Sequence, residues 1–357
     1  MSIDIRNTSY VPTVFLRPSE LQAVAELPDS SKDNLVPIFC LKPWATAKLL
    51  SRSMDKISEV FPNREFFLDI DPFYDRDAKR QSQHDFYELI DDEDNNQSWV
   101  DFFDEFPNAF PCLQVNRANL AAIRNQIQGF TENEKTFLVR LDRDYGENFS
   151  EIIDLVCGTD HADFGFVLDA GWSRDLLSRS SWVDGLIKQI TANRDDNIPI
   201  IVTGSSFPNS FSQYEMGEEV SVHERSLFFQ LQSQNNQARL VYGDWASSRS
   251  PSEAGGGGII PPRIDLATSN SWEIFRADDE YPTFSDLAEK VMASDAYPRY
   301  LSIWATYMIE KTALDEPNGI TNGRKAAAVR INMHLYRQLN FDNFDAAPDT
   351  DDDYIGD

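Results

Sequence analysis

Short apolar segments recur along the chain, and most of them end on a charged or hydrogen-bonding residue. We expect a strand in each of eight segments, at residues 36–42, 66–71, 111–116, 136–142, 165–169, 198–203, 239–244 and 259–265. Helix-like stretches separate most of these segments, which is the layout of a (β/α)8 TIM-type barrel in the α/β class. The functional face of such a barrel lies at the C-terminal ends of its strands, so the pattern predicts where a site lies but not its chemistry.

The length of the chain fits one large domain. Its 357 residues and 41% apolar content suffice for a single core. We predict an N-terminal arm at residues 1–10, a (β/α)8-like barrel at 11–341 and a disordered acidic tail at 342–357. Helices over 284–293, about 299–313 and about 323–339 would follow the last strand. The tail contains seven aspartates and neither lysine nor arginine, which is typical of disorder.

Charge and composition narrow the class of protein. The formal net charge of −27 makes direct nucleic-acid binding unexpected, because phosphates are bound by positive surfaces. The sequence has no apolar run long enough to predict a membrane span, and its N-terminus lacks the pattern of a secretory signal. Three widely spaced cysteines and four histidines without metal-ligand spacing favour a reduced, cytoplasmic protein without a zinc site. The acidity has two interpretations, which are solubility and a surface made for a basic partner.

Aspartates at the predicted strand ends are the main candidates for chemistry. Asp69 and Asp71 lie two residues apart, so they share one side of their strand. Together with Asp142, Asp169 and Asp244 they could ring the barrel mouth and hold Mg²⁺. Two of them could instead act as a general acid and base in the manner of a glycosidase. We take Asp69, Asp71, Asp169 and Asp244 as candidate catalytic residues, and the alternative role of each is to cap a helix or a turn.

Cations and small polar side chains near the same strand ends are candidates for holding an anion. The candidate ligand-binding residues are Lys42, Asn116, Arg140, Ser205, Ser206 and Arg263. Backbone N–H groups and hydroxyls after the sixth predicted strand, at Ser205 and Ser206, could hold a phosphate or carboxylate. Lys42 could equally form a salt bridge with a neighbouring aspartate, and the two serines could belong to a tight turn that needs no ligand.

Several short motifs along the chain point to one family. They are Tyr10-Val11-Pro12, Glu20-Leu21, Val36-Pro37-Ile38, Gly204-Ser205-Ser206-Phe207-Pro208, Glu224-Arg225, Tyr242-Gly243-Asp244-Trp245 and the C-terminal stretch from Gly323-Arg324 to Arg330-Ile331-Asn332-Met333-His334-Leu335. With these motifs the chain resembles the "beta protein" family of phages and bacteria. The resemblance covers roughly residues 10–340. The chain departs from the family in its acidic tail, in Gly255–Gly258 and in Trp245, where the family tends to have tyrosine. The resemblance implies a context in phages, prophages and bacterial defence neighbourhoods, and it implies no chemistry.

Three functional hypotheses follow, of which the glycosidase-like enzyme ranks last. The leading hypothesis is a phage- or defence-associated barrel that binds a small anionic or nucleotide-like ligand at the strand C-termini and could hydrolyse it, with Mg²⁺ as a candidate cofactor. The rival is a non-catalytic acidic interaction or immunity protein that engages a basic protein partner. A glycosidase-like enzyme rests only on fold analogy and paired acids.

Overall fold

The computed structural model describes residues 3, 5–91, 93–115, 119–160, 163–194, 197–249 and 261–341. The chain divides into two compact units. Unit 1 comprises Met1–Leu16, Leu35–Ser206 and His223–Trp245, and unit 2 comprises Arg17–Asn34, Phe207–Val222 and Ala246–Asp357.

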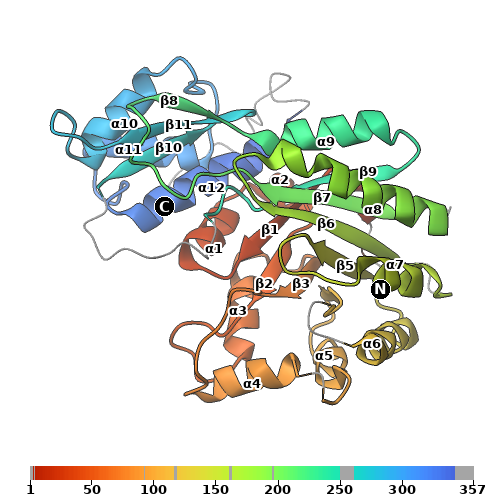
Figure 1. Ribbon diagram of the computed structural model, residues 1–357. Coiled ribbons are helices and arrows are strands. Elements are labelled where there is room, and N and C mark those ends of the chain that lie inside the picture. The colour runs from red at the N-terminus through yellow and green to blue at the C-terminus, as the bar shows by residue number, and fades with distance from the viewer. Residues whose placement is uncertain are drawn as a thin grey trace. The chain divides into compact units, whose positions relative to one another are not determined.

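Unit 1 contains an eight-stranded parallel sheet that is nearly closed into a barrel (Figure 1). Its strands are β1 (Tyr10–Phe15), β2 (Ile38–Leu41), β3 (Phe66–Ile70), β4 (Ala109–Pro111), β5 (Phe137–Asp142), β6 (Phe164–Trp172), β7 (Pro199–Ser205) and β9 (Arg239–Asp244). Their order in the sheet is β4-β3-β2-β1-β9-β7-β6-β5. A parallel bridge between Cys112 and Leu138 joins the two outer strands, so the strands follow one another around the barrel in chain order. The predicted (β/α)8-like fold is confirmed.

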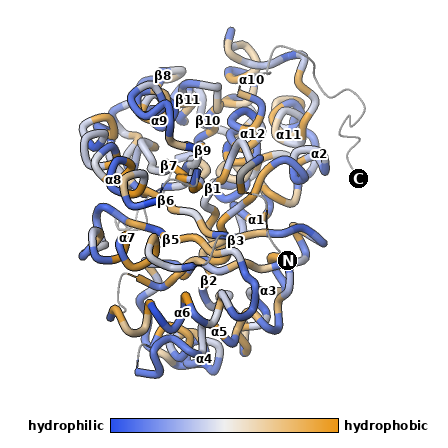
Figure 2. Tube along the Cα trace, turned by 90° about the vertical axis from the view of Figure 1, so that its right-hand side faces the viewer, coloured by the Kyte–Doolittle hydropathy of each residue, from blue (hydrophilic) through white to orange (hydrophobic). Residues whose placement is uncertain are grey.

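The strands form because apolar residues fill both of their faces, as a parallel sheet covered by helices requires. One layer of the barrel interior is a buried cluster to which each strand contributes a side chain, namely Val11, Ile38, Phe67, Phe110, Leu138, Val167, Ile201 and Val241, with Cys112 beside them. Ile3 and Ile5 join this cluster, so these two residues of the predicted N-terminal arm are packed into the core. Figure 2 shows hydrophobic residues concentrated along the strands at the centre of the sheet.

Helices of unit 1 follow the strands and bury one face each. They are η1 (Ile5–Asn7), α3 (Ser51–Val60), α4 (Gln81–Leu89), α5 (Gln97–Phe102), α6 (Leu120–Glu132), α7 (Phe149–Cys157), η2 (Leu176–Arg179), α8 (Ser180–Asn193) and α9 (His223–Gln234). In α6, for example, Asn119 caps the first turn by accepting from the amides of Ala121 and Ala122, and Ile123 and Phe130 are buried.

Unit 2 combines a small antiparallel sheet with helices. Its sheet has the order β10-β11-β8, formed by β10 (Arg263–Ala267), β11 (Ser271–Arg276) and β8 (Glu218–Ser221). Its helices are α1 (Pro18–Ala25), α2 (Asp29–Asp33), α10 (Phe284–Ala293), α11 (Trp304–Ala313) and α12 (Gly323–Leu339). The last three helices confirm the predicted C-terminal helices, with α11 beginning several residues later than predicted. No helix within the described ranges is long and apolar enough to cross a membrane.

One of the eight predicted barrel strands is wrong. The segment expected at 259–265 supplies β10, which belongs to the antiparallel sheet of unit 2, and the place in the barrel is taken by β1. The eight predicted strand segments did not include Tyr10–Phe15, whereas β1 pairs in parallel with both β2 and β9. The physical reason is local, because β11 begins only a few residues after β10 and a hairpin closes at little entropic cost.

Candidate functional site

The barrel interior changes from apolar to polar toward the carboxyl ends of the strands. Because side chains alternate between the two faces of a strand, the residues two positions after the apolar layer also point inward. This next layer contains Thr13 on β1, Asp69 on β3, Arg140 on β5 and Asp169 on β6, all of them buried. The sequence therefore places charged groups inside the barrel by strand periodicity alone.

Arg140 joins this polar layer into one network. Its Nε donates to Oδ2 of Asp69 at 2.7 Å, its Nη1 donates to Oδ2 of Asp169 at 2.8 Å, and its Nη2 donates to Oγ1 of Thr13 at 3.1 Å. Burial disfavours the charged guanidinium, but the two carboxylates outweigh burial and hold the pKa of Arg140 above its ordinary value. Trp245 adds an indole N–H at 3.1 Å from Oδ2 of Asp169. The arginine is thus engaged on all of its nitrogens within the protein.

A second ion pair lies one layer nearer the mouth. Nζ of Lys42 donates to Oδ2 of Asp71 at 2.7 Å, while Oδ1 of Asp71 accepts from the amide of Phe73 at 3.0 Å. Lys42 also stands 5.5 Å from the ring centre of Phe15, within cation–π range. The salt bridge that sequence reasoning gave as the alternative role of Lys42 is present.

Aromatic side chains from the strand ends cover the barrel axis. Phe15, Trp172 and Trp245 stack on one another, with 4.3 Å between the ring centres of the two tryptophans. Phe73 packs edge-on against Trp172 and against Tyr145, with ring centres 5.5 Å apart in each pair. The centre of one of these rings, that of Trp245, lies 5.2 Å from the guanidinium of Arg140, and an opening lies beside the aromatic cluster.

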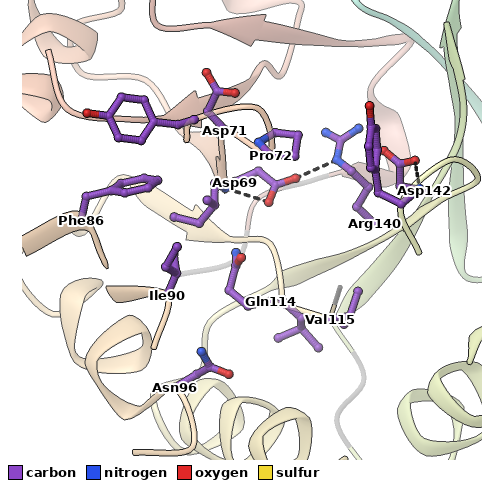
Figure 3. Close-up of a pocket in the computed structure, with 14 residues that line it drawn as sticks. Asp69, Asp71, Pro72, Phe86, Ile90, Asn96, Gln114, Val115, Arg140 and Asp142 are labelled. Atoms are coloured by element: carbon purple, nitrogen blue, oxygen red, sulfur yellow. Dashed lines mark hydrogen bonds and ion pairs between the residues drawn. The ribbon is translucent and has the colours of Figure 1, made fainter. Parts of the chain in front are cut away.

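That opening is a cavity of about 200 Å³ at the carboxyl ends of β3, β4 and β5 (Figure 3). Its polar lining comes from Asp69, Asp71, Tyr74, Asn96, Gln114, Arg140, Asp142 and Tyr145, and its apolar lining from Ile70, Pro72, Phe86, Ile90, Leu113 and Val115. In Figure 3 the charged groups lie in the upper part of the view, and Phe86, Ile90 and Val115 lie to the left and below. The cavity therefore offers a charged wall and an apolar wall to one molecule.

Asp142 differs from the other carboxylates of the cavity. Its Oδ1 accepts from the amides of Asp144 at 2.8 Å and Tyr145 at 3.1 Å. No described residue donates a hydrogen bond to its Oδ2, whereas both oxygens of Asp69 and Asp71 have donors. Burial, followed by the negative charge of Asp169, raises the pKa of Asp142 to about 7, although the amides and Arg140 act in the opposite direction.

The donor set does not fit the predicted Mg²⁺ ion. Within the described ranges, no three histidine, cysteine, aspartate or glutamate side chains are grouped so that they could hold a metal. Asp69 and Asp169 are held on either side of Arg140, which supplies the positive charge that a metal would bring.

Several predicted site residues within the described ranges do not line the cavity, among them Asp244, Ser206 and Arg263. Asp244 points to the outer face of β9, because Val241 points inward, and it accepts from the hydroxyls of Tyr10 at 2.7 Å and Tyr242 at 2.9 Å. Ser206 binds Glu224 at the start of α9, through its amide at 2.7 Å and its hydroxyl at 2.6 Å. Arg263 lies on β10 in unit 2, and Asn116 lies outside the described residues.

Most of the remaining predicted residues belong to the two ion-paired groups inside the barrel. Lys42, Asp69, Asp71, Arg140 and Asp169 form the two ion-paired groups, and Ser205 is a buried residue at the end of β7. Sequence reasoning noted Asp142 but did not choose it, and it missed Gln114 and Thr13. Strand periodicity could have identified Gln114, because it lies two residues after the inward-pointing Cys112 and therefore on the inner face of the barrel.

Comparisons with known proteins identify the family of the chain and give no chemistry. A family model described as "Beta protein" matches residues 10–340, a range that includes every strand of the barrel and the whole cavity. "Protein beta" of Enterobacteria phage P4 is 27% identical over 353 residues, which is 95% of this chain and 95% of the phage protein. The chain is therefore a member of the Beta protein family.

Proposed function

We propose that unit 1 binds a small molecule in the cavity at the ends of β3, β4 and β5, and that this molecule presents a hydrogen-bond donor such as a protonated amine or a hydroxyl. The observation that carries the proposal is the open Oδ2 of Asp142, a residue that lines the cavity, is only 2% exposed and receives no hydrogen bond at this oxygen from the described residues. A second open acceptor supports it, since Oε1 of the half-buried Gln114 receives no hydrogen bond from the part of the chain that the structure describes. Both residues line the cavity, so a ligand with donor groups can hydrogen-bond to these two oxygens in place of water.

The charges of the mouth argue for a donor rather than for the anion expected from the sequence. Lys42 is paired with Asp71, and Arg140 is paired with Asp69 and Asp169, so neither cation is left to hold a phosphate. Asp142 adds a further negative charge when it is ionised. An anion would therefore meet repulsion in a partly buried cavity, where charges are weakly screened.

The chemistry that this cavity supports is proton transfer at Asp142. A carboxyl whose pKa is about 7 can accept or donate a proton near neutral pH, which is what a general acid or base requires. Asp69 and Asp71 are held by donors on both oxygens, so they fit a positioning role better than that of a second acid. If the ligand is hydrolysed, we propose that Asp142 activates the water.

The test is ligand-induced stabilisation of the full chain. Ethanolamine, putrescine, small polyols, inorganic phosphate and adenosine monophosphate would be added separately, and the melting temperature measured above and below the pKa of Asp142. We expect an amine or polyol to raise the melting temperature of the wild type and not of Asp142→Asn, since a ligand that binds only the folded state stabilises it. The matched control is Asp154→Asn, an exposed carboxylate on α7. Stabilisation by the anions alone, or stabilisation that Asp142→Asn leaves unchanged, would refute the proposal.

A non-catalytic acidic protein that engages a basic partner is the second candidate, and the net charge of −27 supports it. The kinship with a phage protein supports a role in phage biology or in antiviral defence. The two candidates can be separated by phage plating on cells that express the wild type, Asp142→Asn or a chain without residues 342–357. Loss of the effect in Asp142→Asn favours the cavity, and loss only after the deletion favours the partner.

A further inference from the structure

We propose that unit 2 carries an oxyanion-binding site at Arg263, Arg276 and Arg330, separate from the cavity of unit 1 and independent of its proposed function. Arg263 and Arg276 are directly opposite each other in the antiparallel pair of β10 and β11. Residues opposite each other project from the same face of a sheet, and like charges placed so are destabilising. Arg330 reaches the same face from α12, where it meets Asp265.

Asp265 is the ion-pair partner of two of these arginines, and the buried carboxylate of Glu20 also acts on the charge of Arg330. Nε of Arg263 lies 2.8 Å from Oδ1 of Asp265, and Nη1 of Arg330 lies 3.0 Å from Oδ2. Arg276 has no hydrogen-bond or ion-pair partner for its side chain among the described residues. Glu218 is the nearest acid on the third strand, diagonal to Arg276, but it is exposed and binds the amide of Glu215 at 2.8 Å. Three arginines therefore face two buried carboxylates, Asp265 and Glu20, in a chain whose net charge is −27.

The guanidinium groups are held in place while part of their donor edge stays open. The guanidinium of Arg263 lies 3.3 Å from the ring centre of Phe211, and that of Arg330 lies 4.3 Å from the ring centre of Phe207. Arg330 donates from Nε to Oγ of Ser247 at 3.4 Å. Within the described ranges no acceptor reaches Nη2 of Arg330 or either terminal nitrogen of Arg263.

A small oxyanion would accept hydrogen bonds from the open donors of these arginines and add negative charge to the group. Guanidinium groups bind phosphate and carboxylate through parallel N–H donors. Stacking of a guanidinium on an aromatic ring fixes the plane in which these donors lie. Arg330 is only 4% exposed and shares its ion-pair partner Asp265 with Arg263, so an added anion would supply negative charge that Asp265 divides between two guanidinium groups. Burial, followed by repulsion from Arg263, lowers the pKa of Arg330, whereas Asp265 and Glu20 raise it, and a bound anion would act in the same direction as these carboxylates. The ligand class is therefore inorganic phosphate or a molecule that carries a phosphate or carboxylate group.

The experiment is titration of the full chain with inorganic phosphate by calorimetry, in a buffer free of other oxyanions. We expect saturable binding to the wild type, weakened about tenfold or more in Arg263→Ala and in Arg276→Ala, because each variant loses a charge-assisted donor. Acetate and a phosphomonoester, titrated in parallel, identify which source of the oxyanion is preferred. The matched control is Arg324→Ala, which removes an exposed arginine from the same helix as Arg330 and should bind as the wild type does.

Two results would overturn the proposal. The first is absence of phosphate binding to the wild type. The second is binding that Arg263→Ala and Arg276→Ala leave unchanged, which would mean that phosphate binds elsewhere. The melting temperature without phosphate shows that the variants are folded, and we expect Arg276→Ala to be at least as stable as the wild type there because like-charge repulsion is relieved.

Discussion

Arg140 and Asp69 form an ion pair inside the barrel of unit 1, with Nε of the arginine 2.7 Å from Oδ2 of the aspartate. The two residues are 71 positions apart in the chain, on β5 and β3. Asp169 binds the other side of the guanidinium at 2.8 Å. Arg140, which the sequence suggested as an anion-binding residue, therefore binds two carboxylates of the protein within the barrel.

We expect Arg140→Met to destabilise the protein by about 3–5 kcal/mol, because two buried carboxylates lose their counter-charge. The free energy of unfolding from urea titration, followed by tryptophan fluorescence, measures this loss, since Trp245 lies against the network. Arg143→Met, which changes an exposed arginine on the same chain segment, should change stability by less than about 1 kcal/mol. Equal losses of unfolding free energy in the two variants would mean that the buried ion pairs of Arg140 stabilise the protein no more than the exposed Arg143 does.

Asp142 should make the stability of the protein fall as the pH rises. Its pKa is about 7 in the folded protein and near the ordinary value of 3.8 in the unfolded chain, so between these values the folded state binds more protons. The free energy of unfolding then decreases with rising pH across this window, by a few kcal/mol in total, and is level above it. Asp142→Asn should remove this slope and be more stable than the wild type at about pH 8. Asp154→Asn should keep the slope, and a wild type whose stability rises through the window would contradict the assignment.

Asp244 is expected to stabilise the outer face of β9 rather than to take part in ligand binding. Asp244→Ala leaves the buried hydroxyls of Tyr10 and Tyr242 without their acceptor, at a cost of about 1–3 kcal/mol for each. Tyr10→Phe removes one donor and should cost about 1 kcal/mol. Thermal unfolding measures both effects, and the double variant should be less destabilised than the sum of the two. A loss of ligand binding in folded Asp244→Ala would show that the residue serves the site after all.

Ser206 should likewise prove to be structural. Its hydroxyl donates to Oε2 of Glu224 at 2.6 Å and accepts from the amide of His223 at 3.0 Å, at the start of α9. Burial raises the pKa of Glu224, and the hydrogen bonds from Ser206 oppose that shift. Ser206→Ala should therefore cost about 1–3 kcal/mol of unfolding free energy, and leave ligand affinity unchanged. Ser233→Ala, near the exposed end of the same helix, is the control and should be nearly neutral.

Much of the barrel and part of its site follow from sequence patterns. Seven of the predicted strand segments match strands of the sheet, because buried parallel strands read as short apolar runs between helices. The same alternation places Asp69, Asp71, Arg140 and Asp169 on the inner face. Asp244 was misplaced because its inward neighbour, Gly243, has no side chain to reveal the phase of the strand.

The sequence by itself determined the period of the strands, and with it the order of apolar, charged and aromatic layers along the barrel. Only the tertiary structure decided that β1 completes the barrel while β10 forms a hairpin with β11, since a local pairing competes with a distant one through chain entropy. Only the tertiary structure decided which charges neutralise one another. Partners such as Arg140 and Asp69 come from distant strands, and one charge compensates another only when folding brings the two within a few ångströms.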